Sequence, residues 1–284
     1  MSEENKNPEN CDNQCDHCSA NCGSRKPSKY PLHPRSSVKH VIGIVSGKGG
    51  VGKSFVTSTL ASAMESLTGN VAVLDADITG PSMAHVFGIK EKMYSDGTLA
   101  YPARTAKGMQ VVSTNMMLDS DDQPVIWRGP IVAGVIQQFW SEVFWDDVDY
   151  MFVDMPPGTS DVPLTVFQSL PLDGIIVVTS PQDLVTMVVD KAINMAKMMN
   201  IPVLGLVENM SYVECDKCGN KMEVFGPSHA EEITSKFSIP LLARIPLRTG
   251  YAQAGDEGRI EELDVPEMKE VAALLKEKFD GKAA

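Results

Sequence analysis

The sequence predicts an α/β protein whose mostly parallel sheet is flanked by helices on both faces, with a short cysteine-rich arm ahead of it. From Val38 onward, short apolar runs alternate with helix-length segments, the pattern of a parallel sheet covered by helices. The runs are nearly continuous in Val, Ile and Leu, which suits strands buried on both faces. A glycine-rich segment joins the first run to the first helical segment, at the edge of the sheet where such folds bind ligands.

The apolar runs and the segments between them give the elements in chain order. The candidate strands are Val41–Ser46, Val71–Asp75, Gln110–Ser113, Tyr150–Asp154, Gly174–Thr179, Val203–Glu208 and Leu241–Ile245. The candidate helices are Lys53–Ser66, Ile131–Val143, Leu184–Met199, His229–Lys236 and Pro266–Phe279. The last helix has an apolar stripe and mixed charge, which predicts docking on the protein's own core: Met268, Val271, Leu274, Leu275 and Phe279. A methionine group at helical spacing is also expected to fill the core: Met195, Met198 and Met199.

Composition divides the chain into an arm and one domain. Residues 1–36 are polar and contain almost no large aliphatic side chains, so they cannot bury enough apolar surface to fold unaided. The remainder, residues 37–284, is expected to form a single α/β domain with an inserted cysteine-containing loop at residues 209–226. The 43% hydrophobic content of the 284-residue chain supports a sizeable core, and we see no internal repeat.

Net charge and the N-terminus bear on partners and location. A formal net charge of -12 repels phosphate backbones and anionic lipid head groups, so we expect neither a nucleic-acid nor a membrane partner. The N-terminal segment MSEENKNPEN has no apolar core of a signal peptide, and no stretch approaches the roughly 18 apolar residues of a spanning helix. The sequence therefore predicts a cytoplasmic protein.

A phosphate-binding loop follows the first predicted strand. The segment matches G-x-x-x-x-G-K-[ST] between a strand and a helix, which indicates the P-loop NTPase fold. Its glycines let backbone N–H groups surround the phosphates of ATP, Lys53 reaches the β and γ oxygens, and Ser54 can ligate Mg²⁺. The alternative is a glycine turn that binds nothing. The loop consists of Gly47, Lys48, Gly49, Gly50, Val51, Gly52, Lys53 and Ser54.

A second lysine, Lys48, directly follows the first glycine and lies too early in the loop to repeat the work of Lys53. In the deviant P-loop ATPases, which include the MinD/ParA proteins and the nitrogenase iron protein, a lysine here crosses a dimer interface to the partner's nucleotide. This loop resembles theirs. The role implied for Lys48 is that of an arginine finger, which neutralises transition-state charge when two subunits close. A solvated loop lysine is the alternative.

Carboxylates follow two of the predicted strands. Asp75 and Asp77 end the second strand at the carboxyl edge of the sheet, where they lie beside the phosphates. We expect Asp77 to orient the attacking water and to contact Mg²⁺ through water; a helix-capping role is the alternative. Asp154 ends another apolar strand, the setting of a second Mg²⁺ carboxylate. Gly158 follows closely and can offer its N–H to the γ-phosphate, which makes its loop a candidate switch.

Six motifs occur in order between Val41 and Gly226: Gly47 to Ser54, Asp75 to Ser82, Trp127 to Pro130, Asp154 to Asp161, Asn209 to Ser211 and Cys215 to Gly219. With these motifs the chain resembles the Mrp/ApbC family of iron-sulfur cluster carrier ATPases. The resemblance implies a homodimeric ATPase in which Asn209 reads the adenine edge. It also implies a [4Fe-4S] cluster bridged between subunits by Cys215 and Cys218. Arg128, inside one motif, has no role that we can derive.

The C-x-x-C pair has its own argument for a dimer. Cys215 and Cys218 supply two thiolates, whereas a four-iron cluster or a tetrahedral zinc ion normally takes four, so two chains would complete the site. Lys48 points to a dimer for an unrelated reason. A redox dithiol or half of a zinc site is the alternative.

The N-terminal arm carries its own cysteine group with the spacing C-x3-C-x2-C-x3-C, enough thiolates for a complete cluster within one chain. Zinc is the alternative metal at this site. Members of the family with a long N-terminus also carry such a group, but with wider first and last intervals. His17 lies inside the group and could substitute for a cysteine as a ligand, but a solvated histidine is its expected state. The ligands would be Cys11, Cys15, Cys18 and Cys22.

The function expected from these features is nucleotide-gated carriage. ATP binding closes the dimer, slow hydrolysis regulates it, and a cluster received from a donor scaffold passes to apo iron-sulfur proteins. A MinD/ParA-like positioning ATPase with a structural zinc site is the alternative, and its mark would be a basic amphipathic tail. An electron-donating reductase is a third hypothesis, which would need cysteines near Asp77 or after Asp154, where the sequence has none.

Overall fold

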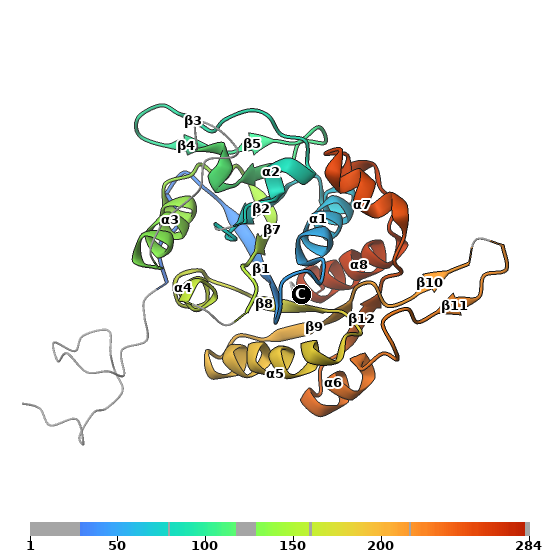
Figure 1. The fold of residues 1–284 in the computed structure, drawn as a ribbon. Coiled ribbons are helices and arrows are strands. Elements are labelled where there is room, and N and C mark those ends of the chain that lie inside the picture. Colours follow the sequence, from blue (N-terminus) through green and yellow to red (C-terminus); the bar gives the residue numbers. More distant parts are fainter. Residues whose placement is uncertain (1–28, 79, 118–128, 159–160, 216, 282–284) are drawn as a thin grey trace, which may run out of the picture.

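A mostly parallel sheet forms the centre of the molecule. The computed structural model describes residues 29–78, 80–117, 129–158, 161–215 and 217–281. Its main sheet has eight strands in the order β12-β9-β8-β1-β7-β2-β6-β5 (Figure 1). Neighbours are parallel except β5 (Ala103–Arg104), which pairs antiparallel with β6. The other strands are β1 (Val38–Ser46), β2 (Val71–Asp75), β6 (Gln110–Val112), β7 (Val148–Asp154), β8 (Gly174–Thr179), β9 (Val203–Glu208) and β12 (Leu241–Arg244).

The predicted strands are all present, with small differences at their ends. β1 begins at Val38 rather than Val41, and β7 begins at Val148 rather than Tyr150. The two extensions share a cause, because Val38 pairs with Val148 in the register of β1 and β7. Burial on both faces is confirmed for β2 and β8, whose residues are all buried, whereas the edge strand β12 is half-buried.

Helices flank the sheet on both faces, as the sequence predicts. α1 (Lys53–Thr68) and α8 (Pro266–Asp280) cover one face (Figure 1). α3 (Gly129–Ser141), α4 (Asp161–Ser169) and α5 (Asp183–Met198) cover the other. α6 (Ala230–Phe237) lies beside α5, to which Lys236 is joined by an ion pair of 2.5 Å with Asp190. Within the described ranges no helix is both long enough and apolar enough to cross a membrane.

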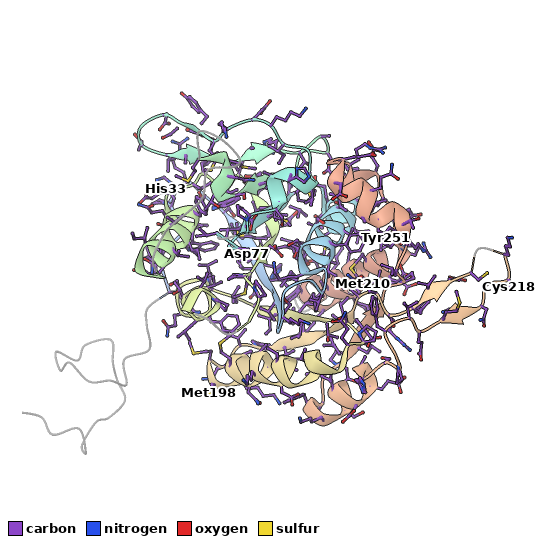
Figure 2. The ribbon with its side chains drawn as sticks, in the orientation of Figure 1. His33, Asp77, Met198, Met210, Cys218 and Tyr251 are labelled. Carbon is purple, nitrogen blue, oxygen red and sulfur yellow. The ribbon has the colours of Figure 1, made fainter. Side chains whose placement is uncertain are left out.

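Two predictions about apolar side chains need correction. The last helix does pack on α1 with Met268, Val271 and Leu275 buried, but Leu274 is 52% exposed because it points away from that stripe. The methionines of α5 divide in the same way. Met195 and Met199, four residues apart on one face, pack against the core, whereas Met198 at the end of the helix is 83% exposed (Figure 2).

Several short elements were not predicted. They lack the length or the apolar period that marks a helix or a strand, and two of the helices contain proline or glycine, which in a sequence normally indicate the boundary of a helix. α4 has Pro163 in its first turn, and α7 contains Gly250 and Gly255. These helices and strands are α2 (Met83–Val86), α4, α7 (Thr249–Asp256), the edge strand β5, the hairpin of β3 (Tyr94–Ser95) with β4 (Ala100–Tyr101), and the hairpin of β10 (Val213–Glu214) with β11 (Lys221–Met222).

The topology gathers the predicted site residues at one edge of the sheet. β1 lies between β7 and β8, and it runs directly into the P-loop and α1. β2 lies on the far side of β7, and Asp75 at its end is the register partner of Asp154 at the end of β7. The P-loop and both acidic strand ends therefore meet at the carboxyl edge, where open α/β sheets bind ligands.

Candidate functional site

The P-loop backbone has the curvature that the glycines predict. A Cβ on Gly47 would lie 2.7 Å from the backbone carbon of Val188 in α5, so only glycine fits there. Gly50 and Gly52 have φ angles of 81° and 77°, in the left-handed region that glycine adopts without strain. α1 then begins at Lys53, and its N-terminal N–H groups face the loop, as a phosphate site requires.

Lys53 and Asp154 form the centre of the site. The Lys53 ammonium lies 2.6 Å from Asp154 Oδ2, and its side chain is only 7% exposed. The fully buried Asp154 carboxylate also accepts hydrogen bonds from Ser54 Oγ at 2.8 Å and from Thr57 Oγ1 at 2.5 Å. The structure thus brings together the two residues predicted for the phosphates and Mg²⁺ and the predicted Mg²⁺ carboxylate. Thr57 was not predicted; it lies one helical turn after Lys53, on the same face of α1.

Asp77 lies at the mouth of this cluster. Its carboxylate is 4.0 Å from the Lys53 ammonium, and its side chain is 14% exposed. It therefore lies beside Lys53 at the carboxyl edge of the sheet, while its roles toward phosphate, water and Mg²⁺ stay predictions.

Asp75, two residues before Asp77 in the sequence, caps the start of α2. Asp75 Oδ2 accepts hydrogen bonds from the N–H groups of Ser82 and Met83 at the start of α2 and from the hydroxyl of Ser113. Its Oδ1 accepts the N–H of Asp77 at 3.1 Å. Burial, with the neighbouring Asp154 carboxylate as a second cause, raises the pKa of Asp75 to about 7. Asp75 thus fixes the loop that carries Asp77.

Lys48 and Gly158 flank the P-loop. Lys48 is exposed, which suits both a lysine directed at a partner and a solvated one. Gly158 has a φ of 87°, and its N–H donates to the carbonyl of Ser46 at 2.8 Å. For that N–H to reach a γ-phosphate, as the sequence predicts, the bond to Ser46 must break.

Asn209 packs directly against the P-loop. Its side-chain amide donates to the carbonyl of Val51 at 3.0 Å, and the residue is 5% exposed. A Cβ on Gly52 would lie 2.1 Å from Asn209 Nδ2, so glycine is needed at position 52 for this contact as well as for its φ angle. The adenine-reading role implied for Asn209 stays a prediction.

An apolar pocket of about 210 Å³ opens beside Asn209, and the sequence did not reveal it. Phe55 of α1 and Tyr251 of α7 line it, with ring centroids 5.0 Å apart and planes 30° apart. Met210 and Pro246 also line it, and Figure 2 shows Met210 and Tyr251 on this side of the molecule. No local pattern joins residues so far apart in sequence, so only the fold could bring them together.

The C-x-x-C pair lies on a hairpin that projects from the body of the molecule (Figure 1). Cys218 is exposed near its tip (Figure 2), and Cys215 is half-buried at the end of β10. The backbone N–H of Cys215 donates to the carbonyl of Asn220, and the backbone N–H of Gly219 donates to the carbonyl of Cys215. These two hydrogen bonds close the turn. Among the described residues, no group of three or more His, Cys, Asp or Glu side chains is arranged so that it could hold a metal ion. Within that part of the chain, the pair therefore supplies two thiolates only.

Three sequence-based predictions concern residues outside the described ranges. These are the N-terminal cysteine group Cys11, Cys15, Cys18 and Cys22, the neighbouring His17, and Arg128. Which metal the N-terminal cysteines bind, iron or zinc, therefore stays a prediction.

Comparisons with known proteins agree with the geometry of the site. The model of the ParA family, described as NUBPL iron-transfer P-loop NTPase, matches residues 37–278. The iron-sulfur cluster carrier protein of Clostridium perfringens is 45% identical over 249 residues, which cover 85% of this chain and 87% of that protein. The carrier of the same name from Methanocaldococcus jannaschii is 40% identical over 285 residues, or 96% of this chain and 98% of that one.

A solved structure supports the fold and the nucleotide site. The nucleotide-binding protein of Archaeoglobus fulgidus, in complex with ADP, superposes with a TM-score of 0.72 at 39% sequence identity. The match covers 81% of this chain and 90% of that one.

Proposed function

The chain belongs to the family of NUBPL iron-transfer P-loop NTPases, and from that premise we propose that it hydrolyses ATP slowly and delivers [4Fe-4S] clusters to apo iron-sulfur proteins. ATP binding and hydrolysis would take place at the P-loop edge of the sheet. The cluster is the cargo, held by the Cys215 and Cys218 thiolates of two chains.

The cluster of the buried Lys53 and Asp154 with the half-buried Ser54 is the observation that carries the nucleotide half of this proposal. Here a buried lysine lies next to a fully buried carboxylate at the start of a helix whose N–H groups face a glycine loop. When the phosphates of ATP lie in the loop, Lys53 can exchange its bond to Asp154 for phosphate oxygens at little cost, because one anion replaces another. This arrangement suits an anionic ligand better than a purely structural ion pair.

Ser54 and Asp154 also fit a magnesium site. They place a hydroxyl and a carboxylate oxygen 2.8 Å apart, and Mg²⁺ prefers hard oxygen ligands of this kind. Mg²⁺ held there would neutralise charge on the β and γ phosphate oxygens. Asp77 lies close enough to Lys53 to contact the γ-phosphate edge, so we assign it the task of orienting the attacking water.

The pocket beside Asn209 suits the adenine ring. Phe55 and Tyr251 provide aromatic walls, and Asn209 provides an amide edge that can pair with a base. The pocket adjoins the P-loop because Asn209 is hydrogen-bonded to Val51. A nucleotide can therefore occupy the loop and the pocket together.

A homodimer completes both halves of the proposal. One hairpin offers two thiolates where a [4Fe-4S] cluster takes four, and an exposed Lys48 is available to a facing nucleotide. The hairpin also exposes apolar side chains on its returning side, namely Met222, Val224 and Phe225. A second copy of the chain is the partner that would satisfy all three features.

The positioning-ATPase alternative gains no support from the last helix. α8 buries its apolar stripe on α1 rather than presenting it to a lipid surface, as expected for a docked helix. Zinc is the alternative to an iron-sulfur cluster at Cys215 and Cys218, and a measurement of iron content decides between them.

Cluster transfer to an apoenzyme tests the proposal. Protein loaded anaerobically with iron and sulfide is mixed with an apo [4Fe-4S] enzyme, with and without Mg-ATP, and the recovered enzyme activity is followed. We expect wild type to restore activity, Cys218→Ser to fail, and Lys48→Ala to keep its iron while losing ATP hydrolysis. Equal recovery from iron and sulfide at the same concentrations without the protein would overturn the carrier assignment.

A further inference from the structure

A buried carboxylate lies between the nucleotide pocket and the cysteine hairpin. Glu208 is the last residue of β9, is 1% exposed, and directly precedes Asn209. Its partner is Arg244 at the end of β12, whose Nε lies 3.2 Å from Glu208 Oε2. The two residues are register partners in neighbouring strands, so the ion pair spans the edge of the sheet.

The same carboxylate holds both ends of the segment that forms the hairpin. Ser211, where the chain leaves the sheet, donates its hydroxyl to Glu208 Oε2 at 2.5 Å. Ser228, where the chain returns to α6, donates to Glu208 Oε1 at 2.8 Å. Arg244 Nε lies 2.9 Å from Ser211 Oγ, and its Nη2 lies 3.6 Å from Glu223 just after β11.

On its other side, Glu208 is one peptide bond from the nucleotide site. Asn209 is fixed to the P-loop carbonyl of Val51 and lines the apolar pocket. Met210, next along the chain, has a φ of 55°, a left-handed conformation that is strained for a non-glycine residue. A ligand that shifts Asn209 must therefore move a short, strained link that ends at the Ser211 bond to Glu208.

The contacts of Glu208 with Arg244, Ser211 and Ser228 are expected to be more rigid than a surface ion pair. Burying a carboxylate is costly unless its oxygens are paired and hydrogen-bonded, and here both oxygens are satisfied. Two hydroxyls and a guanidinium bound to one buried carboxylate resist separate movement of the chain segments that carry them.

We propose that the Glu208–Arg244 ion pair, with Ser211 and Ser228, is a positioning element that links nucleotide occupancy at Asn209 to the geometry of the cysteine hairpin. The inference rests on the proposed function, since it explains how ATP reaches a cluster site on a projecting hairpin. Glu208 and Arg244 act through Asn209 and through the ends of the hairpin segment, without touching the nucleotide or the cluster.

Hydrogen exchange on the full-length, metal-free protein tests the link without needing a cluster. Amide exchange is measured with and without Mg-ATP in two regions, the P-loop at residues 47–54 and the hairpin at residues 213–226. For wild type we expect Mg-ATP to slow exchange in the P-loop and to change exchange in the hairpin by about threefold or more. In the double variant Glu208→Gln with Arg244→Gln, which leaves no buried charge unpaired, we expect the P-loop effect to persist and the hairpin effect to disappear.

A matched control removes an ion pair elsewhere. Asp190→Asn with Lys236→Gln deletes the contact between α5 and α6 and should leave both nucleotide effects unchanged. If the double variant fails to fold, Arg244→Lys keeps the charge but loses the planar guanidinium, and its hairpin response should fall below that of wild type.

Three results would overturn the inference: a wild-type hairpin that does not respond to Mg-ATP, a double variant whose hairpin still responds, or loss of the P-loop effect in the double variant. The last would place the pair in the nucleotide site itself. Because the exchange test requires no iron, the two proposals can fail separately. The carrier proposal can fail in the transfer assay while the link is confirmed, and the link can fail in the exchange test while the carrier proposal is confirmed.

Discussion

Replacing Lys53 with methionine probes the centre of the site, because Lys53 is the cation paired with the buried Asp154. Methionine keeps most of the length and the apolar stem of lysine and removes only the charge. Removing one partner of a buried ion pair costs about 3 kcal/mol or more, because the other charge stays buried and uncompensated. For a domain of this size, a loss of about 3 kcal/mol lowers the melting temperature by roughly 6–12 °C.

The loss should also depend on pH, through Asp75. Burial and the Asp154 carboxylate raise the pKa of Asp75, and the Lys53 charge is among the influences that lower it. Without that charge the pKa of Asp75 rises further, so folded Lys53→Met holds a proton that the unfolded chain has released. The free energy of unfolding then falls as pH rises from the pKa of Asp75 in the unfolded chain to its higher pKa in the folded protein. Between about pH 5.5 and about pH 8 it falls further for the variant than for wild type.

Urea unfolding of the nucleotide-free protein in EDTA, at about pH 5.5 and about pH 8, measures both effects. We expect the gap between wild type and Lys53→Met to be wider at the higher pH. The matched control is Lys48→Met, an exposed lysine of the same loop, which should change the free energy of unfolding by less than about 0.5 kcal/mol. Equal stability of Lys53→Met and wild type at the higher pH, or a gap that does not change with pH, would refute the reasoning.

Three further substitutions test neighbouring contacts. Gly52→Ala adds a methyl group 2.1 Å from Asn209 Nδ2 at a φ of 77°, and we expect urea unfolding to show a loss of about 2 kcal/mol and calorimetry to show weaker ATP binding. Thr57→Val keeps the side-chain shape but removes the hydroxyl bonded to Asp154, and should cost about 2 kcal/mol in urea unfolding; no change would mean that water replaces the hydroxyl. Tyr251→Ala removes one wall of the apolar pocket, and titration calorimetry should show ATP binding weakened about tenfold, whereas unchanged affinity would place the base elsewhere.

The parallel sheet could be predicted because its strands carry their own signal. A run such as Val71–Asp75 is apolar throughout and is buried on both faces, so its neighbours in space add nothing that the residues do not already show. α4 and α7 gave no such signal, because Pro163 and two glycines interrupt their pattern and tertiary packing decides their conformation.

The candidate site likewise has a part that local motifs predict and a part that depends on the fold. Lys53, Ser54 and Asp154 belong to local motifs, and the structure places them within hydrogen-bonding or ion-pairing reach of one another. The role of Asp75 as the anchor of α2, and the pocket lined by Phe55 and Tyr251, depend on contacts between distant segments that no local motif encodes. Met198 and Leu274 were misplaced because a spacing of three residues from one apolar neighbour did not decide their position. The buried stripe of each helix is set by its other apolar residues, and both side chains lie outside it.

The central claim is that two chains share a cluster through Cys215 and Cys218, and iron content tests it most directly. Wild type and the double variant Cys215→Ala with Cys218→Ala are reconstituted anaerobically with iron and sulfide, and iron and labile sulfide are measured per dimer. The account predicts that the variant loses about four irons and about four sulfides per dimer relative to wild type. A double variant that keeps all its iron, or a wild type that takes up only zinc, would contradict it.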